Sequence, residues 1–300
     1  MTNKMKILIG YDGSECADAA LVDLQRAGLP SEVEAYVLAV DEQWLPMPTS
    51  YWMMRTSYES SYPVSDEVKE LAVTAGKKLQ ALFPAWKVLA ESYGGSPASI
   101  ILAGAEQWKP DLIVVGSHGR TGIVKLVLGS ISQKILHHAP CSVRVARGRE
   151  MPADAPVKII VGVDGSTGAE AAVKVVAGRP WPAQTEVLLL SAVPSISAAT
   201  SSLMVMPVSQ WFVEERARVE AAAGKLEKEL RTTGLKVRAM ILEGDPKSVL
   251  LDEAEKWGAD CIFVGAAGMS AIDRLLLGSI SAAVATRAQC SVEVVRSEKA

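Results

Sequence analysis

Hydrophobic residues occur along the chain in short continuous runs, separated by longer stretches in which apolar residues recur every three to four positions. The short runs, such as 112–115, are apolar nearly throughout and predict strands covered on both faces. The longer stretches predict amphipathic helices. In the first half we expect strands at 7–11, 33–40, 86–91, 112–116 and 142–146, and helices at 15–27, 66–82, 98–108 and 130–138.

The second half shows the same alternation. We expect strands at 158–163, 186–192, 236–242, 261–265 and 291–295, with a long helix over 214–231. Five strand–helix units in each half predict an α/β fold with a doubly wound parallel sheet. In such sheets the ligand crevice lies at the carboxyl ends of the strands.

An internal repeat decides the domain organisation. Residues 105–119 read AEQWKPDLIVVGSHG and residues 254–268 read AEKWGADCIFVGAAG, with eight of fifteen positions identical at an offset of 149. The match continues without a gap to Arg147 and Arg296, with thirteen identities in 28 positions. We therefore expect two domains, 1–148 and 157–300, joined by a linker at 149–156.

Composition narrows the possible partners. The net charge is −3 and neither half is basic, so nucleic-acid binding is not expected. The polar start of the chain is no signal peptide. The uncharged stretch 187–212 contains Pro194 and Pro207, which favours a strand and a loop over a membrane span. The four cysteines lack CxxC spacing, so we expect reduced thiols in a cytoplasmic protein, with no zinc site.

A carboxylate follows the first strand of each half, in Asp12-Gly13-Ser14 and Asp164-Gly165-Ser166. The glycine allows a tight turn and the serine is a good helix N-cap. The carboxylate could bind a ribose hydroxyl or help to hold a metal ion. A simple cap and turn explains the motif equally well.

A glycine-rich loop follows the fourth strand of each half. In the first, Gly116 and Gly119 are followed after nine residues by Gly129-Ser130; in the second the matching residues are Gly265, Gly268, Gly278 and Ser279. Glycines let the backbone approach an anion, and Gly129-Ser130 stands at a helix start, where free amides favour phosphate. Arg120 and Lys125 add positive charge. His118 is a candidate phosphate contact or acid/base group, with a backbone hydrogen bond as the alternative.

The pattern G-x2-G-x9-G-[ST], with an Asp just after the first strand, resembles the ATP-binding pattern of the universal stress protein family, in two tandem copies. The resemblance implies a strand order of 3-2-1-4-5 in each domain. It also implies nucleotide contacts at Asp12, Gly116, Gly119, Gly129 and Ser130, with an adenine pocket at Val40. The second-half matches are Asp164, Val193, Gly265, Gly268, Gly278 and Ser279.

The same resemblance suggests ATP as the ligand, with magnesium as a candidate companion. In the family the last strand mediates dimerisation, so we expect the two domains to pair within the chain, while a homodimer stays open. The expected role is regulatory, through a protein partner that the sequence does not identify. A slow ATPase and an interaction module with unused sites are the alternatives, since no convincing general base is visible.

The two sites are not equivalent in sequence. The loop after the fourth strand loses polar and cationic side chains in the second half. Ala266, Ala267 and Met269 stand there in place of Ser117, His118 and Arg120. We therefore expect the first site to bind ATP more tightly. The aromatic stretch 43–62 follows the second strand and is a candidate lid or subunit interface.

Overall fold

The computed structural model of the 300-residue chain describes residues 4–42, 64–119, 128–148, 152, 155–193, 205–268 and 277–297, with the side chains of 205–212 left out. The aromatic stretch 43–62 lies outside these ranges, and so do Arg120, Lys125 and Met269. The expectations placed on them stay predictions.

Both halves alternate strands and helices, and we call them the first and second repeat. The first contains β1 (Met5–Gly10), α1 (Glu15–Asp23), β2 (Val33–Asp41), α2 (Asp66–Leu82), β3 (Lys87–Gly94), α3 (Pro97–Trp108), β4 (Leu112–Gly116), α4 (Ser130–His138) and β5 (Ser142–Ala146). The second contains β6 (Lys158–Gly162), α5 (Thr167–Ala177), β7 (Glu186–Val193), α6 (Val205–Arg231), β8 (Lys236–Glu243), α7 (Pro246–Trp257), β9 (Cys261–Gly265), α8 (Ser279–Arg287) and β10 (Ser291–Val295).

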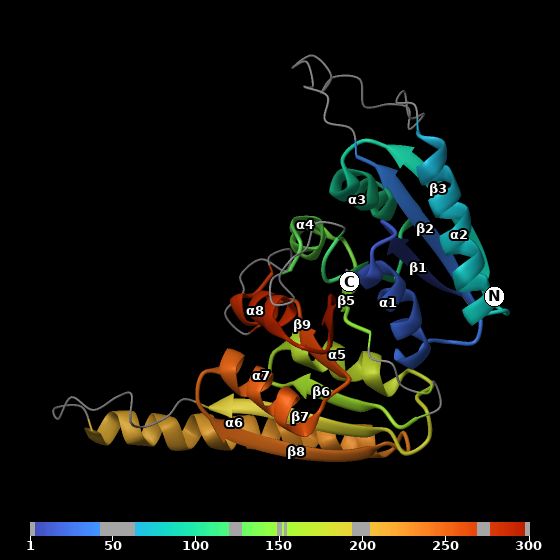
Figure 1. Cartoon of the computed structure of the whole chain (residues 1–300). Coiled ribbons are helices and arrows are strands. Elements are labelled where there is room, and N and C mark those ends of the chain that lie inside the picture. The colour runs from blue at the N-terminus through green and yellow to red at the C-terminus, as the bar shows by residue number, and fades with distance from the viewer. Residues whose placement is uncertain are drawn as a thin grey trace.

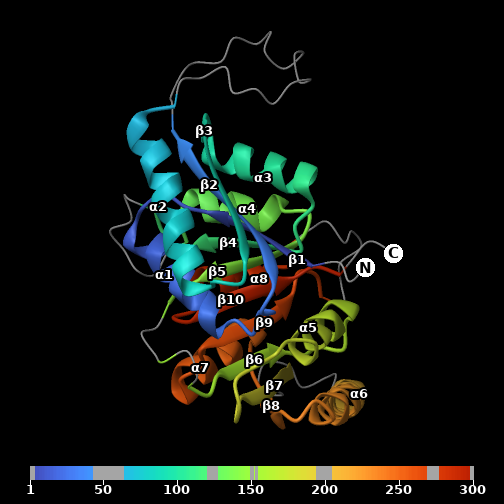
Figure 2. The same cartoon turned by 90° about the vertical axis from the view of Figure 1, so that its right-hand side faces the viewer.

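The strands form one continuous sheet rather than two separate ones. Its order is β3-β2-β1-β4-β5-β10-β9-β6-β7-β8, so each repeat has the expected order 3-2-1-4-5. All pairs inside a repeat are parallel, and only β5 and β10 pair antiparallel. Figure 2 shows this single sheet running through both repeats. Pairing the last strands removes the edge that each repeat would otherwise expose.

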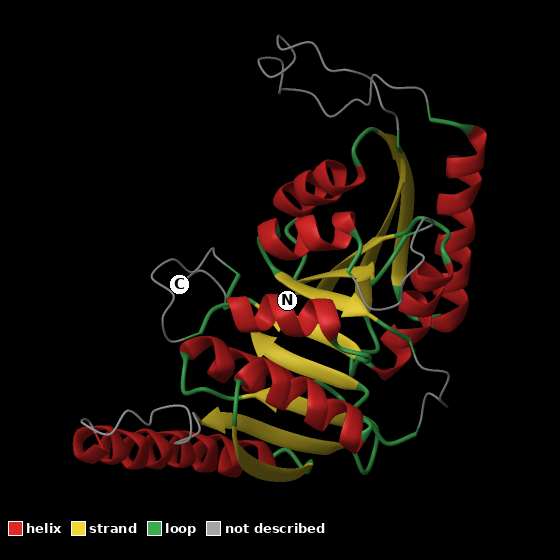
Figure 3. Cartoon of the chain, turned by 60° about the vertical axis from the view of Figure 1, so that its left-hand side comes forward, coloured by secondary structure: helices red, strands yellow, loops and turns green. Residues whose placement is uncertain are grey.

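Helices cover both sides of the sheet, as Figure 3 shows. One core joins both repeats, packing α3, α4, α7 and α8 against residues such as Ile113, Val143, Ile262 and Val292. On the other side, α1 and α2 cover a core in the first repeat, and α5 and α6 cover one in the second. Inner strands such as β4 and β6 are almost wholly buried, which explains their continuous apolar sequence, whereas the edge strands β3 and β8 are more exposed.

Two equivalent sets of hydrogen bonds from arginine side chains join the repeats at their junction. Arg147, just after β5, donates to the carbonyl oxygens of Ala285 and Thr286 at the end of α8, at 2.7 and 3.3 Å. Arg296, just after β10, donates to Leu136 and His137 at the end of α4, at 3.1 and 3.3 Å. Cations at the carboxyl ends of helices satisfy unpaired carbonyls, so these contacts stabilise the pairing of the repeats.

Several elements differ from their expected bounds by a few residues, and helix α6 departs furthest. Helix α6 begins at Val205, nine residues before the expected start at 214 and inside the stretch expected to be a loop. Pro207 falls in the first turn of this helix, where proline is tolerated because its missing N–H would have no partner in any case. Figure 1 shows α6 as the longest helix of the second repeat. Among the helices described, none has the length and apolar character that a membrane crossing requires.

Candidate functional site

In the first repeat the expected ligand crevice would lie at the carboxyl ends of β1 and β4. The strand order runs outward from β1 to β2 on one side and from β4 to β5 on the other, so the connections diverge at this point. Asp12 follows β1, and the loop from Gly116 to Gly119 follows β4. Such divergence points are the usual ligand sites of doubly wound sheets. β6 and β9 form the equivalent crevice in the second repeat.

Both aspartates are held in the same turn. The Ser14 amide donates to Asp12 Oδ1 at 3.0 Å, and Ser14 Oγ caps α1 by accepting from Ala17 N at 3.1 Å. The second repeat repeats this with Ser166 N to Asp164 Oδ1 at 2.9 Å. The cap-and-turn role is therefore real, and it also fixes where the carboxylate points. A Cβ on Gly119 would lie 2.8 Å from Asp12 Oδ2, so this oxygen faces the glycine loop.

Hydrogen bonds from a backbone amide and a serine hydroxyl hold the two ends of each glycine loop together. Gly129 N donates to Ser117 O at 2.8 Å, and Ser132 Oγ donates to Gly116 O at 2.7 Å. In the second repeat Gly278 N donates to Ala266 O at 2.7 Å and Ser281 Oγ to Gly265 O. The start of α4 is thereby held beside the end of β4. The structure thus brings together residues that the sequence separates by more than ten positions.

The glycines of this loop serve two different purposes. A Cβ on Gly116 would lie 3.0 Å from the backbone of Cys16, so this glycine lets β4 approach the start of α1. Gly129 has an ordinary extended conformation, with φ −60° and ψ 149°. Its Cβ would only make normal contacts, the nearest at 3.5 Å to His118 Cα and Ser117 O. A side chain at 129 would therefore fit, and it would project toward the loop.

The first turns of α4 and α8 have no side-chain cap. Gly129 and Gly278 occupy the N-cap positions, and no side chain accepts from the amides that follow. Ser130 and Ser279 are exposed at these helix starts. Unpaired amides and the helix dipole make such a start suitable for an anion. The loop after β4 and the uncapped helix lie on the same side of the crevice.

His118 carries an unsatisfied nitrogen. Its Nδ1 lies 3.0 Å from Ser117 Oγ, while Nε2 is buried without a hydrogen-bond partner. A buried polar atom without a partner costs about 1–3 kcal/mol, so such atoms are uncommon unless something else satisfies them. The expected alternative, a bond from His118 to the nearby backbone, is not seen among the described residues. His118 Nε2 is therefore a candidate ligand contact.

In the second repeat the crevice opens into a cavity of about 140 Å³. Its polar end is lined by the predicted residues Asp164, Gly265, Gly268, Gly278 and Ser279. Its apolar end is lined by residues of β7 and α7, including Leu190, Ala192, Val249 and Leu250. One cavity therefore combines an anion-binding loop with an apolar wall.

The structural counterpart of Val40 in the second repeat falls one residue away from the residue matched in sequence. Val40 pairs with Tyr93, and Ala192 pairs with Leu242, 149 residues after Tyr93. Ala192 is thus the structural counterpart of Val40, and it lines the cavity. Val193 is buried on the other face of β7 because successive strand residues point to opposite faces. The strand register is the same in both repeats, since Lys6 pairs with Glu34 and Lys158 pairs with Glu186, so the match of Val193 to Val40 was one residue out of step with the repeat.

Arg218 of α6 is a cation near the second site that the sequence comparison missed. A Cβ on Gly165 would lie 2.8 Å from its Nη1. Its hydrogen bond to Glu215 raises the pKa of Arg218, and the charge of Asp164 adds to this effect. Because Arg218 is already paired with Glu215, it adds less net charge than an unpaired arginine would. Its position depends on how α6 packs, and no local motif reveals this.

Comparisons with known proteins agree on one family. The sequence model of the universal stress protein family matches residues 4–147 and 157–296. A universal stress protein of Methanocaldococcus jannaschii is 30% identical over 144 residues, which are 47% of this chain and 81% of that protein.

Solved structures agree over nearly the whole chain. A universal stress protein of Archaeoglobus fulgidus covers 97% of this chain and 98% of its own, with a TM-score of 0.62 at 20% identity. A Pseudomonas aeruginosa protein of unknown function covers 97% and 92%, with a TM-score of 0.64 at 18% identity. These two likenesses concern the fold. The two family matches, one in each repeat, show that this chain belongs to the universal stress protein family.

Proposed function

We propose that the chain binds ATP at the carboxyl edge of its sheet, in both repeats, and that occupancy regulates contact with another protein. The observation that carries the proposal is the pair of matched loops. Each combines an aspartate held by a backbone amide, a glycine at the N-cap of the following helix, and a helix start without a side-chain cap. Together they offer amide donors for phosphates and a carboxylate for a ribose hydroxyl.

The apolar end of the second cavity supports a nucleoside over a simple phosphate. Leu190, Ala192 and Val249 would cover a flat base, while Gly268 and Gly278 would hold the phosphates. Ligand sites commonly combine an apolar wall with a few fixed polar groups. In the first repeat, Val40 takes the position of Ala192.

Magnesium would depend on the nucleotide for most of its ligands. No group of three or more metal-binding side chains occurs in the part of the chain that the structure describes. Magnesium at phosphate sites usually takes one or two carboxylates together with phosphate oxygens and water. Asp12 and Asp164 are the carboxylates that would face it.

We further propose that the first repeat is the stronger site. Ser117 and His118 are present there, whereas Ala266 and Ala267 replace them in the second repeat. The buried His118 Nε2 has no hydrogen-bond partner, so a phosphate oxygen would satisfy it. Arg218 offsets part of this difference in the second repeat, although Glu215 already neutralises it.

Nucleotide analysis of the purified full-length protein tests the proposal. Mass spectrometry should find intact adenine nucleotide after gentle purification, and added ATP should raise the melting temperature. ADP that accumulates over time would favour a slow ATPase. An empty protein whose melting temperature does not change with millimolar ATP would refute nucleotide binding.

A further inference from the structure

A groove in the first repeat lies beside the outermost strand pair and away from the glycine loop. It has a volume of about 330 Å³ and runs between α3 and the neighbouring strands β2 and β3. Leu89 of the edge strand β3 lines it and is 51% exposed. Gly104 on α3 keeps the groove open, because a Cβ there would approach Leu38 Cδ1 to 3.2 Å.

Three aromatic rings line this groove. Tyr36 comes from β2, Tyr93 from β3 and Trp108 from the last turn of α3. The rings of Tyr36 and Trp108 meet edge to face, with centroids 5.5 Å apart. Aromatic faces carry negative charge density, so a group of rings around an open space attracts cations.

A carboxylate, Glu91, lies next to the groove and bonds to the two tyrosines that line it. Both tyrosine hydroxyls donate to Glu91 Oε2, and the two hydroxyl oxygens lie 2.9 Å apart. Burial raises the pKa of Tyr36 and of Tyr93, and their bonds to Glu91 raise it further. The hydroxyls thus stay protonated as donors. Within the described ranges no lysine, arginine or histidine forms an ion pair with Glu91, which leaves its charge without a cationic partner.

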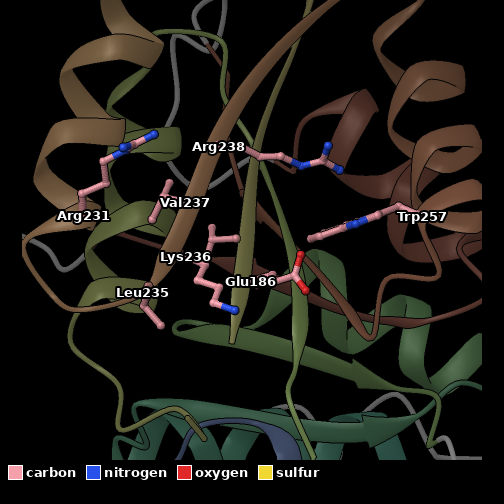
Figure 4. Close-up of a pocket in the computed structure, with 8 residues that line it drawn as sticks. Glu186, Arg231, Leu235, Lys236, Val237, Arg238 and Trp257 are labelled. Carbon is pink, nitrogen blue, oxygen red and sulfur yellow. The ribbon is translucent and has the colours of Figure 1, made fainter. Parts of the chain in front are cut away.

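The second repeat has different charges at the equivalent positions. Arg238 stands where the first repeat has Leu89, and Met240 stands where it has Glu91. The Arg238 guanidinium lies 5.1 Å from the centre of the Trp257 ring, and Trp257 corresponds to Trp108. Figure 4 shows Arg238 extending from β8 toward Trp257. In both repeats a lysine of the first strand also lies over this ring, Lys6 at 5.4 Å from Trp108 and Lys158 at 5.6 Å from Trp257. Only the second repeat adds the arginine, and it lacks the carboxylate.

We propose that the groove of the first repeat binds a small organic cation, an ammonium group attached to an apolar body. The aromatic rings and Glu91 would hold the ammonium group, at the place where Arg238 lies in the second repeat. Leu38, Leu89 and Ile100 would cover the apolar body. A site of this size and composition is in the range of small-molecule pockets, and rings combined with a carboxylate are suited to ammonium ions.

Choline and its neutral carbon isostere, 3,3-dimethylbutan-1-ol, separate charge recognition from simple apolar binding. The indole N–H signal of Trp108, assigned with Trp108→Phe, should shift and saturate as choline is added to the full-length protein. The signal of Trp257 should stay unchanged. The neutral isostere should bind at least about tenfold more weakly.

Two variants and one control test the residues. Glu91→Gln keeps the shape of the side chain and should weaken choline binding about tenfold or more. Leu89→Arg introduces the cation of the second repeat and should abolish saturation. Glu106→Gln removes an exposed carboxylate from α3, the helix that carries Trp108, and should leave the affinity for choline unchanged. Circular dichroism melting of each variant verifies folding.

Three results would overturn the proposal: equal binding of choline and its isostere, equal shifts at Trp108 and Trp257, or unchanged affinity in a folded Glu91→Gln variant. Titration of Glu91→Gln with ATP keeps this test separate from the proposed nucleotide site. Because Glu91 is not part of the glycine loop, ATP affinity should be retained even where choline affinity is lost.

Discussion

Arg144 and Glu293 occupy equivalent positions of the two repeats, 149 residues apart, and face each other across the antiparallel pair of β5 and β10. Arg144 Nη1 lies 3.2 Å from Glu293 Oε2, and both side chains are at most 1% exposed. At this position two identical repeats would place like charges together in a buried site. Because one repeat has an arginine here and the other a glutamate, pairing of the first repeat with the second within one chain is favoured.

This pair belongs to a buried ionic chain that crosses the junction. Asp23, near the end of α1, accepts from Arg144 Nε at 2.6 Å, and Glu293 also pairs with Arg179, just after α5. Helices α1 and α5 both begin at the aspartate turns of the two crevices. The ends of these helices that lie farthest from the candidate sites are thus joined through four charged side chains.

Glu293→Gln should destabilise the folded chain by about 3–5 kcal/mol, because it leaves buried arginines without a full counter-charge. Urea denaturation followed by circular dichroism measures the change. Glu255→Gln removes an exposed carboxylate from α7 and should stay within about 0.5 kcal/mol of the original protein. A similar stability for both variants would show that the buried chain of charges contributes little.

Gly28→Ala should cost more stability than Gly258→Ala. Both glycines have a left-handed φ, 62° and 68°, so the backbone strain of about 1–2 kcal/mol is shared. A Cβ on Gly28 would also lie 2.7 Å from the Trp181 ring in the other repeat, whereas one on Gly258 meets nothing within 4 Å. We expect an additional cost of about 1–3 kcal/mol at Gly28. Equal melting temperatures of the two variants would mean that the Trp181 ring can move away from residue 28 at no cost in stability.

Cys141 should react slowly with alkylating reagents in the native protein. Burial, with the charge of Asp111 in second place, raises the pKa of its thiol to about 12. At pH 8 roughly one thiol in ten thousand is then ionised, and only the thiolate is the nucleophile. Because the pKa is raised, the rate should still increase about tenfold per pH unit between pH 8 and 10. A plateau near pH 9 in iodoacetamide labelling followed by mass spectrometry would contradict this.

His118→Ala should weaken ATP binding in the first repeat by about 1.5–3 kcal/mol, the usual range for a hydrogen bond to a charged group. The substitution creates the residue that the second repeat has at Ala267. His138→Ala, at the far end of α4, is the matched control and should bind normally. Calorimetric titration measures both. Unchanged affinity in His118→Ala would mean that the buried Nε2 has no contact with the nucleotide.

The sequence predicted the strands well because buried parallel strands are apolar along their whole length. β4, β5, β9 and β10 have the bounds that the pattern indicates. The strand order came from the family resemblance rather than from periodicity, and the structure confirms it in both repeats. The continuous ten-stranded sheet depends on the pairing of edge strands, which local patterning does not specify.

Long-range packing explains what the sequence missed. The match of Val193 to Val40 is an exception, because the offset of 152 residues that relates Lys6 to Lys158 already gives Ala192. Arg218 lies beside the second site because α6 packs there, and no motif marks it. The opposite charges of Arg144 and Glu293 are visible when the repeats are aligned, but their partners Asp23 and Arg179 come from other elements. The nucleotide contacts themselves stay predictions.

Calorimetric titration of ATP into two full-length variants tests the central claim most directly. Gly129→Glu and Gly278→Glu each place a carboxylate toward one glycine loop, at positions where a Cβ meets its nearest neighbours at 3.5 and 3.3 Å. The account predicts that Gly278→Glu retains one tighter site and that Gly129→Glu retains one weaker site. Equal affinities would contradict the difference between the repeats, and undiminished binding to two sites in either variant would contradict the placement of the phosphates.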